Sequence, residues 1–420
     1  MGPPFFFLMT TAIPRLLAQA FLNGELRKQE MVKRGAELLG RKWKWLGPLA
    51  ARFLKEFRGE KPRLGAAARF LRHDEALCTA RVELRIAKWT PSNGATAMRW
   101  KLPEIANPAE LAQWLGLTDS EAAWFADRKN INTGKSSHYS YRVFEKPGKT
   151  ARLIEAPKTR MKELLRRLLV DIFAKIPVHA AAHGFVVGHS IKSFAAPHVG
   201  QACVLKMDLA DFFPSISRAR VESLLITAGY DESVAELLAG MCTNRAPRDV
   251  APSPIYTKPH LPQGAPTSPA IANLCMFRAD RRLRGLAESA GAVYTRYADD
   301  LAFSGGPNVA RLAPYAAAIL EEEGFHVNHR KTRVMRRGTR QKLAGLVVNE
   351  KVNVSRAEFD GLKALLTNCA RMGPASQNRD DIADFRAHLN GRVAFVESVS
   401  PERGAKLRKI LETIDWVARM

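Results

Sequence analysis

The 420-residue sequence predicts an α+β fold, in which an antiparallel sheet carries helices on one face. Two observations lead to this prediction. Strand-like and helix-like patterns alternate along the chain, and the strand-like segments are Tyr139–Pro157, Ala202–Asp208, Val293–Ser304 and Lys342–Asn349. The composition, 46% hydrophobic and 25% charged, can bury a core and excludes disorder as a description of the whole chain.

The chain is strongly basic. It contains 65 Lys and Arg against 41 Asp and Glu, a formal net charge of +24. A field of this sign attracts polyanions, so nucleic acid is the leading candidate partner. The five cysteines form no CxxC pair, which argues against a Cys-rich zinc site and fits a reducing cytoplasm. No run approaches ~18 uninterrupted apolar residues, so no membrane partner is expected.

The N-terminal region from about Leu16 to Lys88 is predicted to be helical, because Ala, Leu, Arg, Lys and Glu dominate it. Trp43 and Trp45 flank a lysine within it. They anchor a helix to the core or stack on bases, and the first alternative is favoured. Trp89–Ala97 reads as a turn-rich linker.

The remaining elements follow from local signals. Leu111–Asp127 predicts two short helices, the second capped by Thr118 or Asp119. Tyr139–Pro157 reads as two strands joined by a Lys-Pro-Gly-Lys turn. Further helices are predicted over Met161–Ile176, Ala219–Ala228, Ser233–Cys242, Ser268–Ala290 and Val309–Glu323, with a helical tail over Ser355–Met420.

Three aspartates form the main candidate for a site. An apolar strand delivers Asp208 at its end, and the adjacent pair Asp299 and Asp300 interrupts the strand-like run Tyr294–Gly305. Ionised carboxylates at the edge of an apolar sheet are unfavourable unless a cation or donor compensates them. A solvated turn explains an isolated Asp-Asp pair, but it does not explain a further aspartate, Asp208, at the end of another strand.

Oxygen ligands with few protein carboxylates suit magnesium, which keeps several waters and binds substrate phosphates. If Asp208 faces one of the pair, the two can bridge two ions about 3.5–4 Å apart and support in-line phosphoryl transfer. Successive strand residues point to opposite faces, so the tip must distort if both Asp299 and Asp300 serve. Asp299 is the favoured ligand.

Two further patterns carry polar side chains. The segment His260–Leu274 forces a tight turn before a helix, and Gln263 within it can donate to a phosphate or sugar. The alternative is an ordinary Pro-rich loop capping a helix. His179 and His183 have a zinc-compatible spacing, but a structural or RNA-contacting role is favoured over a metal site.

Together the Tyr-Ala-Asp-Asp hairpin, the strand ending Asp-Phe-Phe-Pro-Ser-Ile and the Leu-Pro-Gln-Gly turn resemble the motifs of a reverse transcriptase, in that family's order, over Tyr139 to Asp415. The resemblance implies a right-hand polymerase fold with an antiparallel palm sheet, fingers and a helical thumb. Its implied divisions are a basic helical extension over 1–105, fingers over 106–202, palm over 203–342, and primer grip with thumb over 343–420.

The resemblance also implies roles for individual residues. Asp208, Asp299 and Asp300 would be the catalytic carboxylates and, with the carbonyl of Leu209, the ligands of two magnesium ions, with manganese as the alternative. Phe213 matches the bulky gate that rejects a ribose 2′-OH. Other residues implied to contact the nucleotide are Gln263, Arg152 with Lys146 or Lys149, and Lys331, whose ammonium would protonate pyrophosphate.

Within the family, bacterial retron enzymes are nearest. RNA-binding roles are implied for His198, Lys342 and Gly345, although Phe194 stands where retrons carry Asn and Ala344 where they carry Thr. The implied function is an RNA-directed DNA polymerase that uses dNTPs to make branched RNA–DNA (msDNA) from its own structured non-coding RNA, in phage defence with an effector protein. The alternatives are a non-retron bacterial reverse transcriptase, an RNA-synthesising palm enzyme, and a catalytically retired RNA-binding scaffold.

Overall fold

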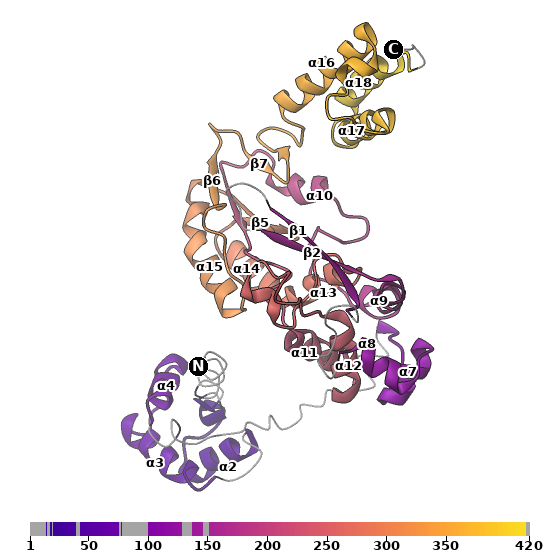
Figure 1. The fold of residues 1–420 in the computed structure, drawn as a ribbon. Coiled ribbons are helices and arrows are strands. Elements are labelled where there is room, and N and C mark those ends of the chain that lie inside the picture. The colour runs from indigo at the N-terminus through magenta and orange to yellow at the C-terminus, as the bar shows by residue number, and fades with distance from the viewer. Residues whose placement is uncertain are drawn as a thin grey trace. The chain divides into compact units, whose positions relative to one another are not determined.

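The computed structural model describes residues 14, 17–18, 20–38, 43–74, 77, 100–127, 137–145 and 151–416 (Figure 1). The chain divides into two compact units, Met1–Pro91 and Ser92–Met420. The predicted linker over Trp89–Ala97 lies outside the described residues, as does the Lys-Pro-Gly-Lys turn. No helix in the described ranges is long and apolar enough to cross a membrane.

The described part of the first unit is helical, as its composition predicts. Its helices include α2 (Lys28–Leu38), α3 (Leu46–Glu56) and α4 (Leu64–Arg72). Buried Met31 and Phe53 belong to the core of this unit. Trp43 and Trp45 are partly buried against the same core with ring centroids 6.2 Å apart, so the prediction that they anchor a helix is confirmed.

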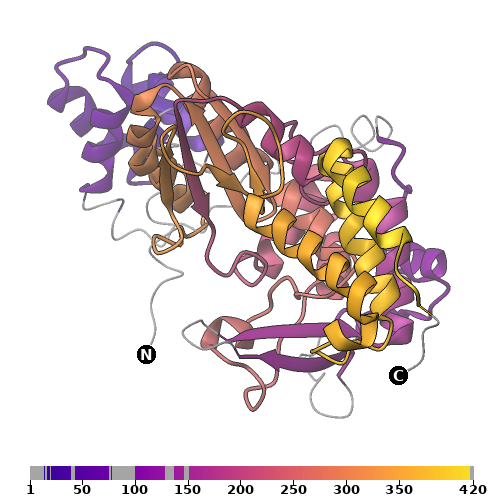
Figure 2. The same cartoon turned by 90° about the horizontal axis from the view of Figure 1, so that it is seen from above.

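The second unit combines helices with three small sheets. It opens with α7 (Pro108–Leu115) and α8 (Asp119–Phe125), and Thr118 caps α8 in a capping box with Glu121. The strands β1 (Tyr139–Phe144) and β2 (Arg152–Pro157) pair antiparallel as a separate ribbon (Figure 2).

A four-stranded antiparallel sheet forms the centre of this unit. Its order is β4 (Val293–Tyr297), β5 (Asp300–Gly305), β3 (Cys203–Asp208) and β6 (Arg333–Arg336). The mixed α+β class is thereby confirmed. The other helices are α9 (Thr159–Asp171), α10 (Ile191–Ala195), α11 (Arg218–Ala228), α12 (Glu232–Cys242), α13 (Ser268–Cys275), α14 (Phe277–Ser289), α15 (Ala313–Glu322), α16 (Arg356–Met372), α17 (Phe385–Val399) and α18 (Pro401–Glu412).

Several predicted elements are divided in the structure, as two examples show. The long helix expected over Ser268–Ala290 is split into α13 and α14 at Met276. The strand expected over Lys342–Asn349 is a short hairpin of β7 (Lys342–Leu343) and β8 (Leu346–Val347). Its turn residues Ala344 and Gly345 have φ of 44° and 91°, and this left-handed backbone cannot continue a strand.

The central sheet has two different faces. Leu205, Met207 and Phe303 belong to the core that includes residues of α14 and α15, and those two helices lie along the same side of the sheet (Figure 1). Val204 and Ala302, which alternate with them, pack in a second core with residues of α16, α17 and α18. By the period of two, the Asp208 side chain points to this second face.

A buried histidine ties the second face to the preceding loop. His198 is fully buried, and its ring nitrogens lie 2.6 Å from the Ser304 hydroxyl and 2.7 Å from the Thr295 hydroxyl. The Thr295 hydroxyl donates to the Phe194 carbonyl at 3.0 Å, so His198 Nε2 donates to Thr295 and Nδ1 accepts from Ser304. The expectation that this side chain binds RNA does not fit its burial, because both ring nitrogens are already bonded.

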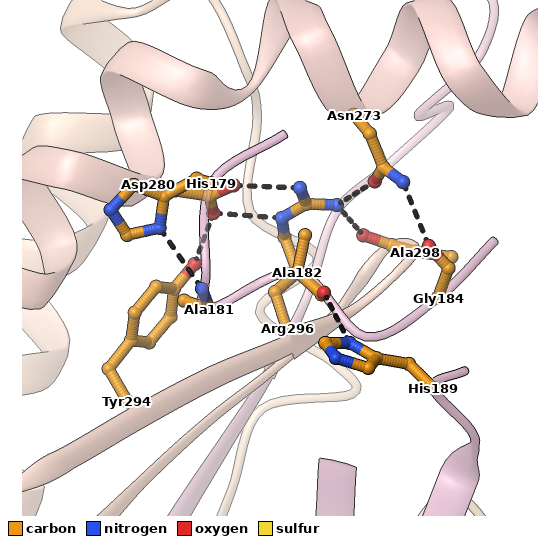
Figure 3. A network of polar contacts seen from close by, with 10 residues as sticks. All are labelled: His179, Ala181, Ala182, Gly184, His189, Asn273, Asp280, Tyr294, Arg296 and Ala298. Atoms are coloured by element: carbon orange, nitrogen blue, oxygen red, sulfur yellow. Dashed lines mark hydrogen bonds and ion pairs between the residues drawn. The ribbon is translucent and has the colours of Figure 1, made fainter. Parts of the chain in front are cut away.

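A buried ion pair fixes β4 to α14. Arg296 and Asp280 are both fully buried and form a bidentate pair, Nε to Oδ1 at 2.8 Å and Nη2 to Oδ2 at 2.7 Å (Figure 3). The Tyr294 hydroxyl donates to the same carboxylate at 2.8 Å. The guanidinium is planar and both carboxylate oxygens are hydrogen-bonded. This arrangement compensates the cost of removing the two charges from water.

The same guanidinium supports the β4–β5 turn. Arg296 Nη1 donates to the Ala298 carbonyl and to Asn273 Oδ1, both at 3.0 Å, and the Asn273 amide donates to the Gly184 carbonyl at 2.8 Å (Figure 3). Ala298 has a φ of 55°, so this turn is strained and needs such support. One buried cluster therefore joins α13, α14, the turn and the loop at Gly184.

We predict that Asp280→Asn lowers the free energy of unfolding by about 3–5 kcal/mol, because it leaves the Arg296 charge buried without its partner. Urea denaturation measures this loss. The matched control is Asp360→Asn, which removes an exposed partner of Arg356 and should lower it by less than about 1 kcal/mol. An equal effect of the two substitutions would contradict the assigned role of the buried pair.

His198 makes a pH-dependent contribution to stability. Burial, and then the nearby His183, lower the pKa of His198 to about 4. Between pH 6.5 and 4 the unfolded chain thus binds more protons at this position, so stability is lost as the pH falls through that window, by about 3 kcal/mol in total. Unfolding measured across this range should have a shallower slope in His198→Gln than in the parent chain. Identical slopes would show that His198 does not titrate in this way.

Candidate active site

The three predicted aspartates lie together at one end of the central sheet. Asp208 ends β3 and is the register partner of Asp300, the first residue of β5. The backbone of Leu209 donates to the Asp299 carbonyl at 3.0 Å, which brings the turn onto the end of β3. The predicted convergence of Asp208 with the Asp299 turn is therefore present, and the distortion expected at the tip is the left-handed Ala298.

Two lysines neutralise part of this negative charge. Lys331 Nζ lies 2.8 Å and 3.1 Å from the two oxygens of Asp208, whose side chain is 7% exposed. Lys206 Nζ lies 2.9 Å from an oxygen of Asp300. Lys206 precedes Asp208 by two positions, so it lies on the same face of β3.

The Asp299 carboxylate lies among like charges. Burial, and then the charge of Asp208, raise the pKa of Asp299, and the charge of Asp300 acts in the same direction. Lys331 opposes this rise. The cluster therefore has more negative charge than its lysines offset, and a cation placed between Asp208 and Asp299 would be stabilised there.

The donor set fits hard divalent ions. Among the described residues, no three His, Cys, Asp or Glu side chains form a ready-made metal cage. Magnesium does not require one, because it is often held by one or two carboxylates together with substrate phosphates and water. Asp208 and Asp299 are the side chains that could hold such ions, and for Asp208 this requires Lys331 to give up its ion pair. Asp300 is paired with Lys206.

The turn that carries Gln263 is fixed to β2. The Gln263 carbonyl accepts from the Glu155 amide at 2.9 Å, and a Cβ added at Gly264 would lie 2.7 Å from the Glu155 carbonyl oxygen, so only glycine fits there. The buried Glu155 carboxylate lies 2.8 Å from His260 Nε2 and accepts from the Asn244 amide at 2.7 Å. The half-buried Gln263 is thus attached to a rigid base.

The other predicted contact residues are placed as follows. Phe213 is half-buried beside the sheet end, and Arg152 is exposed at the start of β2. Lys342 is paired with Glu358 at 3.5 Å, and Gly345 is exposed in the β7–β8 turn. Lys146 and Lys149 lie outside the described residues.

Several polar partners of the site were not predicted from the sequence. Alternation along β3 could have indicated Lys206, because it places this lysine beside Asp208. Arg296 is a charge within a strand-like run, a signal that it needs a buried partner, but nothing local points to Asp280. The histidines His179 and His183 bond to Ala181 and Ser193, and no metal group includes them among the described residues.

Known proteins of one family are similar to this chain. The family model for reverse transcriptase (RNA-dependent DNA polymerase) matches residues 144–361. The chain is 44% identical to the retron Mx65 reverse transcriptase of Myxococcus xanthus over 74% of this chain and 75% of that protein. It is 37% identical to the retron Mx162 enzyme of the same organism, over 72% and 66%. A solved telomerase from Candida albicans aligns with 12% identity and a TM-score of 0.36, over 72% of this chain and 64% of that chain, which is too distant to support a conclusion.

The family match covers the segment that contains the aspartates, the Gln263 turn and the central sheet. Reverse transcriptases generally use divalent metal ions, in keeping with the carboxylates found here. The identities to retron enzymes favour that family over the non-retron alternative. The chain therefore belongs to the retron reverse transcriptases, which are RNA-directed DNA polymerases.

Proposed function

We propose that Asp208 and Asp299 hold two magnesium ions and that the chain copies its own structured RNA into a branched RNA–DNA product. The observation that supports the catalytic part is that the β4–β5 turn lies against the end of β3, where Leu209 donates to the Asp299 carbonyl and where burial and the charge of Asp208 raise the pKa of Asp299. The relatives' names as retron enzymes support the RNA–DNA product. The chemistry is in-line phosphoryl transfer, in which positioning and electrostatics supply most of the rate.

When bound, the ions would lower the pKa of the attacking hydroxyl and neutralise charge on the leaving pyrophosphate. Lys331 would exchange its ion pair with Asp208 for the incoming triphosphate, where its ammonium can donate a proton to the pyrophosphate. Lys206 would keep Asp300 paired, so Asp300 supports the site as a neighbour more than as a ligand.

The remaining predicted contacts select the nucleotide and the RNA. In this proposal Gln263 contacts the incoming nucleotide, Arg152 contacts its triphosphate and Phe213 blocks a ribose 2′-OH. Lys342 and Gly345, at the β7–β8 hairpin, are the proposed contacts to RNA. Phe194, which replaces the retron-typical Asn, is fully buried in the second core, so RNA recognition here would use other groups.

Asp208→Asn should lower nucleotide incorporation by a factor of about 10³ or more, because it removes a shared metal ligand. RNA binding, measured by fluorescence anisotropy, should not weaken, because the substitution removes a negative charge that would repel RNA phosphates. Primer extension on an RNA template is the activity assay, and Glu288→Gln, which removes an exposed carboxylate of α14, is the control. If Asp208→Asn polymerises normally, the catalytic assignment is wrong; if the parent chain does not polymerise either, the retired-scaffold alternative is favoured.

RNA affinity should fall steeply with salt, because Lys and Arg that neutralise phosphates release counterions. With the net charge of +24, we expect the dissociation constant to rise at least about tenfold between 50 and 200 mM salt. A titration of a structured RNA at several salt concentrations gives the slope. An affinity that stays constant over this range would contradict an electrostatic mode of binding.

A further inference from the structure

One aromatic residue beside the site has an unusual conformation. Phe185 has a φ of 61°, and its side chain is 52% exposed. Left-handed backbone is a genuine outlier for a bulky residue and persists only where the surroundings impose it. Exposing a large apolar ring to water is also unfavourable. Burial of the Phe185 side chain therefore does not explain why the backbone adopts this conformation.

The surroundings that impose this conformation are the buried cluster of Figure 3. The His183 amide donates to the Arg296 carbonyl at 2.7 Å, and the Asn273 amide donates to the Gly184 carbonyl at 2.8 Å. A Cβ added at Gly184 would lie 2.5 Å from the Ala298 nitrogen, so the loop rests directly on the catalytic turn. The residue after Gly184 therefore has little freedom.

The consequence of this placement is a set of ring contacts. The Phe185 ring lies 6.2 Å from the ring of Phe213 and 6.4 Å from the ring of Tyr297, measured between centroids. Phe213 also contacts the buried Phe212 at 5.4 Å. The Phe213 ring thus has a buried aromatic neighbour and an exposed one, and tilted pairs at these distances are attractive.

We infer that Phe185 is a specificity-determining residue that holds Phe213 in the orientation that excludes a ribose 2′-OH. The inference rests on the proposed function, in which Phe213 is the gate. A steric gate discriminates only if its ring cannot rotate away when a larger sugar enters. Phe185 restricts that rotation from the exposed side, and the cluster around Arg296 fixes Phe185. Phe185 is a positioning residue, since it acts through Phe213.

A double-mutant cycle tests this inference in the full chain. The measured quantity is the ratio of kcat/KM for a dNTP to that for the matching rNTP, in primer extension on an RNA template. The variants are Phe185→Ala, Phe213→Ala and the double variant. Phe185→Ala should lower the ratio about threefold to tenfold, the range expected for loss of one aromatic pair. It should have no further effect in the Phe213→Ala background.

Two matched variants separate specificity from folding. Tyr315→Ala removes the ring of a residue of α15 that is 63% exposed. α15 packs on the face of the sheet opposite to the one to which Asp208 points, so the ratio should be unchanged. Phe185→Tyr keeps the ring, so its ratio should be close to that of the parent chain. A loss of the ratio caused by misfolding would not depend on whether residue 185 carries an aromatic ring. If Phe185→Ala does not fold, Phe185→Leu, which keeps the apolar bulk but lacks the ring, should lower the ratio in the same direction.

The outcomes distinguish the inference from the proposed function. If Phe213→Ala lowers the ratio and neither Phe185 variant does, the inference is overturned and the gate stands. If the effects of Phe185→Ala and Phe213→Ala multiply, Phe185 acts independently of the gate, and the inference is again overturned. If Phe213→Ala itself leaves the ratio unchanged, the gate assignment fails and the inference fails with it.

Discussion

Repulsion among three carboxylates is the constraint around which the centre of this protein is organised. Asp208, Asp299 and Asp300 converge at one end of an apolar sheet, where Asp208 is buried and the other two are half-buried. The lysines Lys206 and Lys331 offset part of the charge. Burial and the like charges raise the pKa of Asp299, and a cation bound beside it would relieve the repulsion, as the proposed function requires.

A site of this kind functions only if its geometry is fixed. Three buried groups supply that rigidity from different sides of the sheet. Arg296 with Asp280 supports the turn from α14, and His198 fastens the second face. The Glu155–His260 contact fixes the Gln263 turn to β2. In each case a polar group that is unfavourable in a core has all its partners, the condition under which buried polarity specifies a single arrangement.

Local patterns in the sequence were sufficient for most of the fold. The apolar run Cys203–Asp208, the cap at Thr118 and the acidic tip of the hairpin each act over a few residues, and the structure reproduces them. The approach of Asp208 and Asp299 could also be predicted, since carboxylates at the ends of apolar strands need a cation or a donor to compensate them.

Features that depend on residues far apart in the sequence could not be predicted from local patterns. The pairing of Arg296 with Asp280 and the burial of His198 are set by how α14 and the 183–198 loop pack on the sheet. The division of the predicted strand at Ala344 depends on a left-handed backbone at a residue whose side chain gives no such signal. The role inferred for Phe185 likewise depends on its ring contacts with Phe213 and Tyr297, which are distant in the sequence.

The most direct test of the shared-ion claim is electron paramagnetic resonance of manganese added to the chain with an RNA template, a terminated DNA primer and a dNTP. The parent chain should bind two ions whose spins couple, because they would lie about 3.5–4 Å apart. Asp299→Asn should abolish the coupled signal. An unaltered coupled signal in that variant would contradict the claim that Asp299 and Asp208 share the ions.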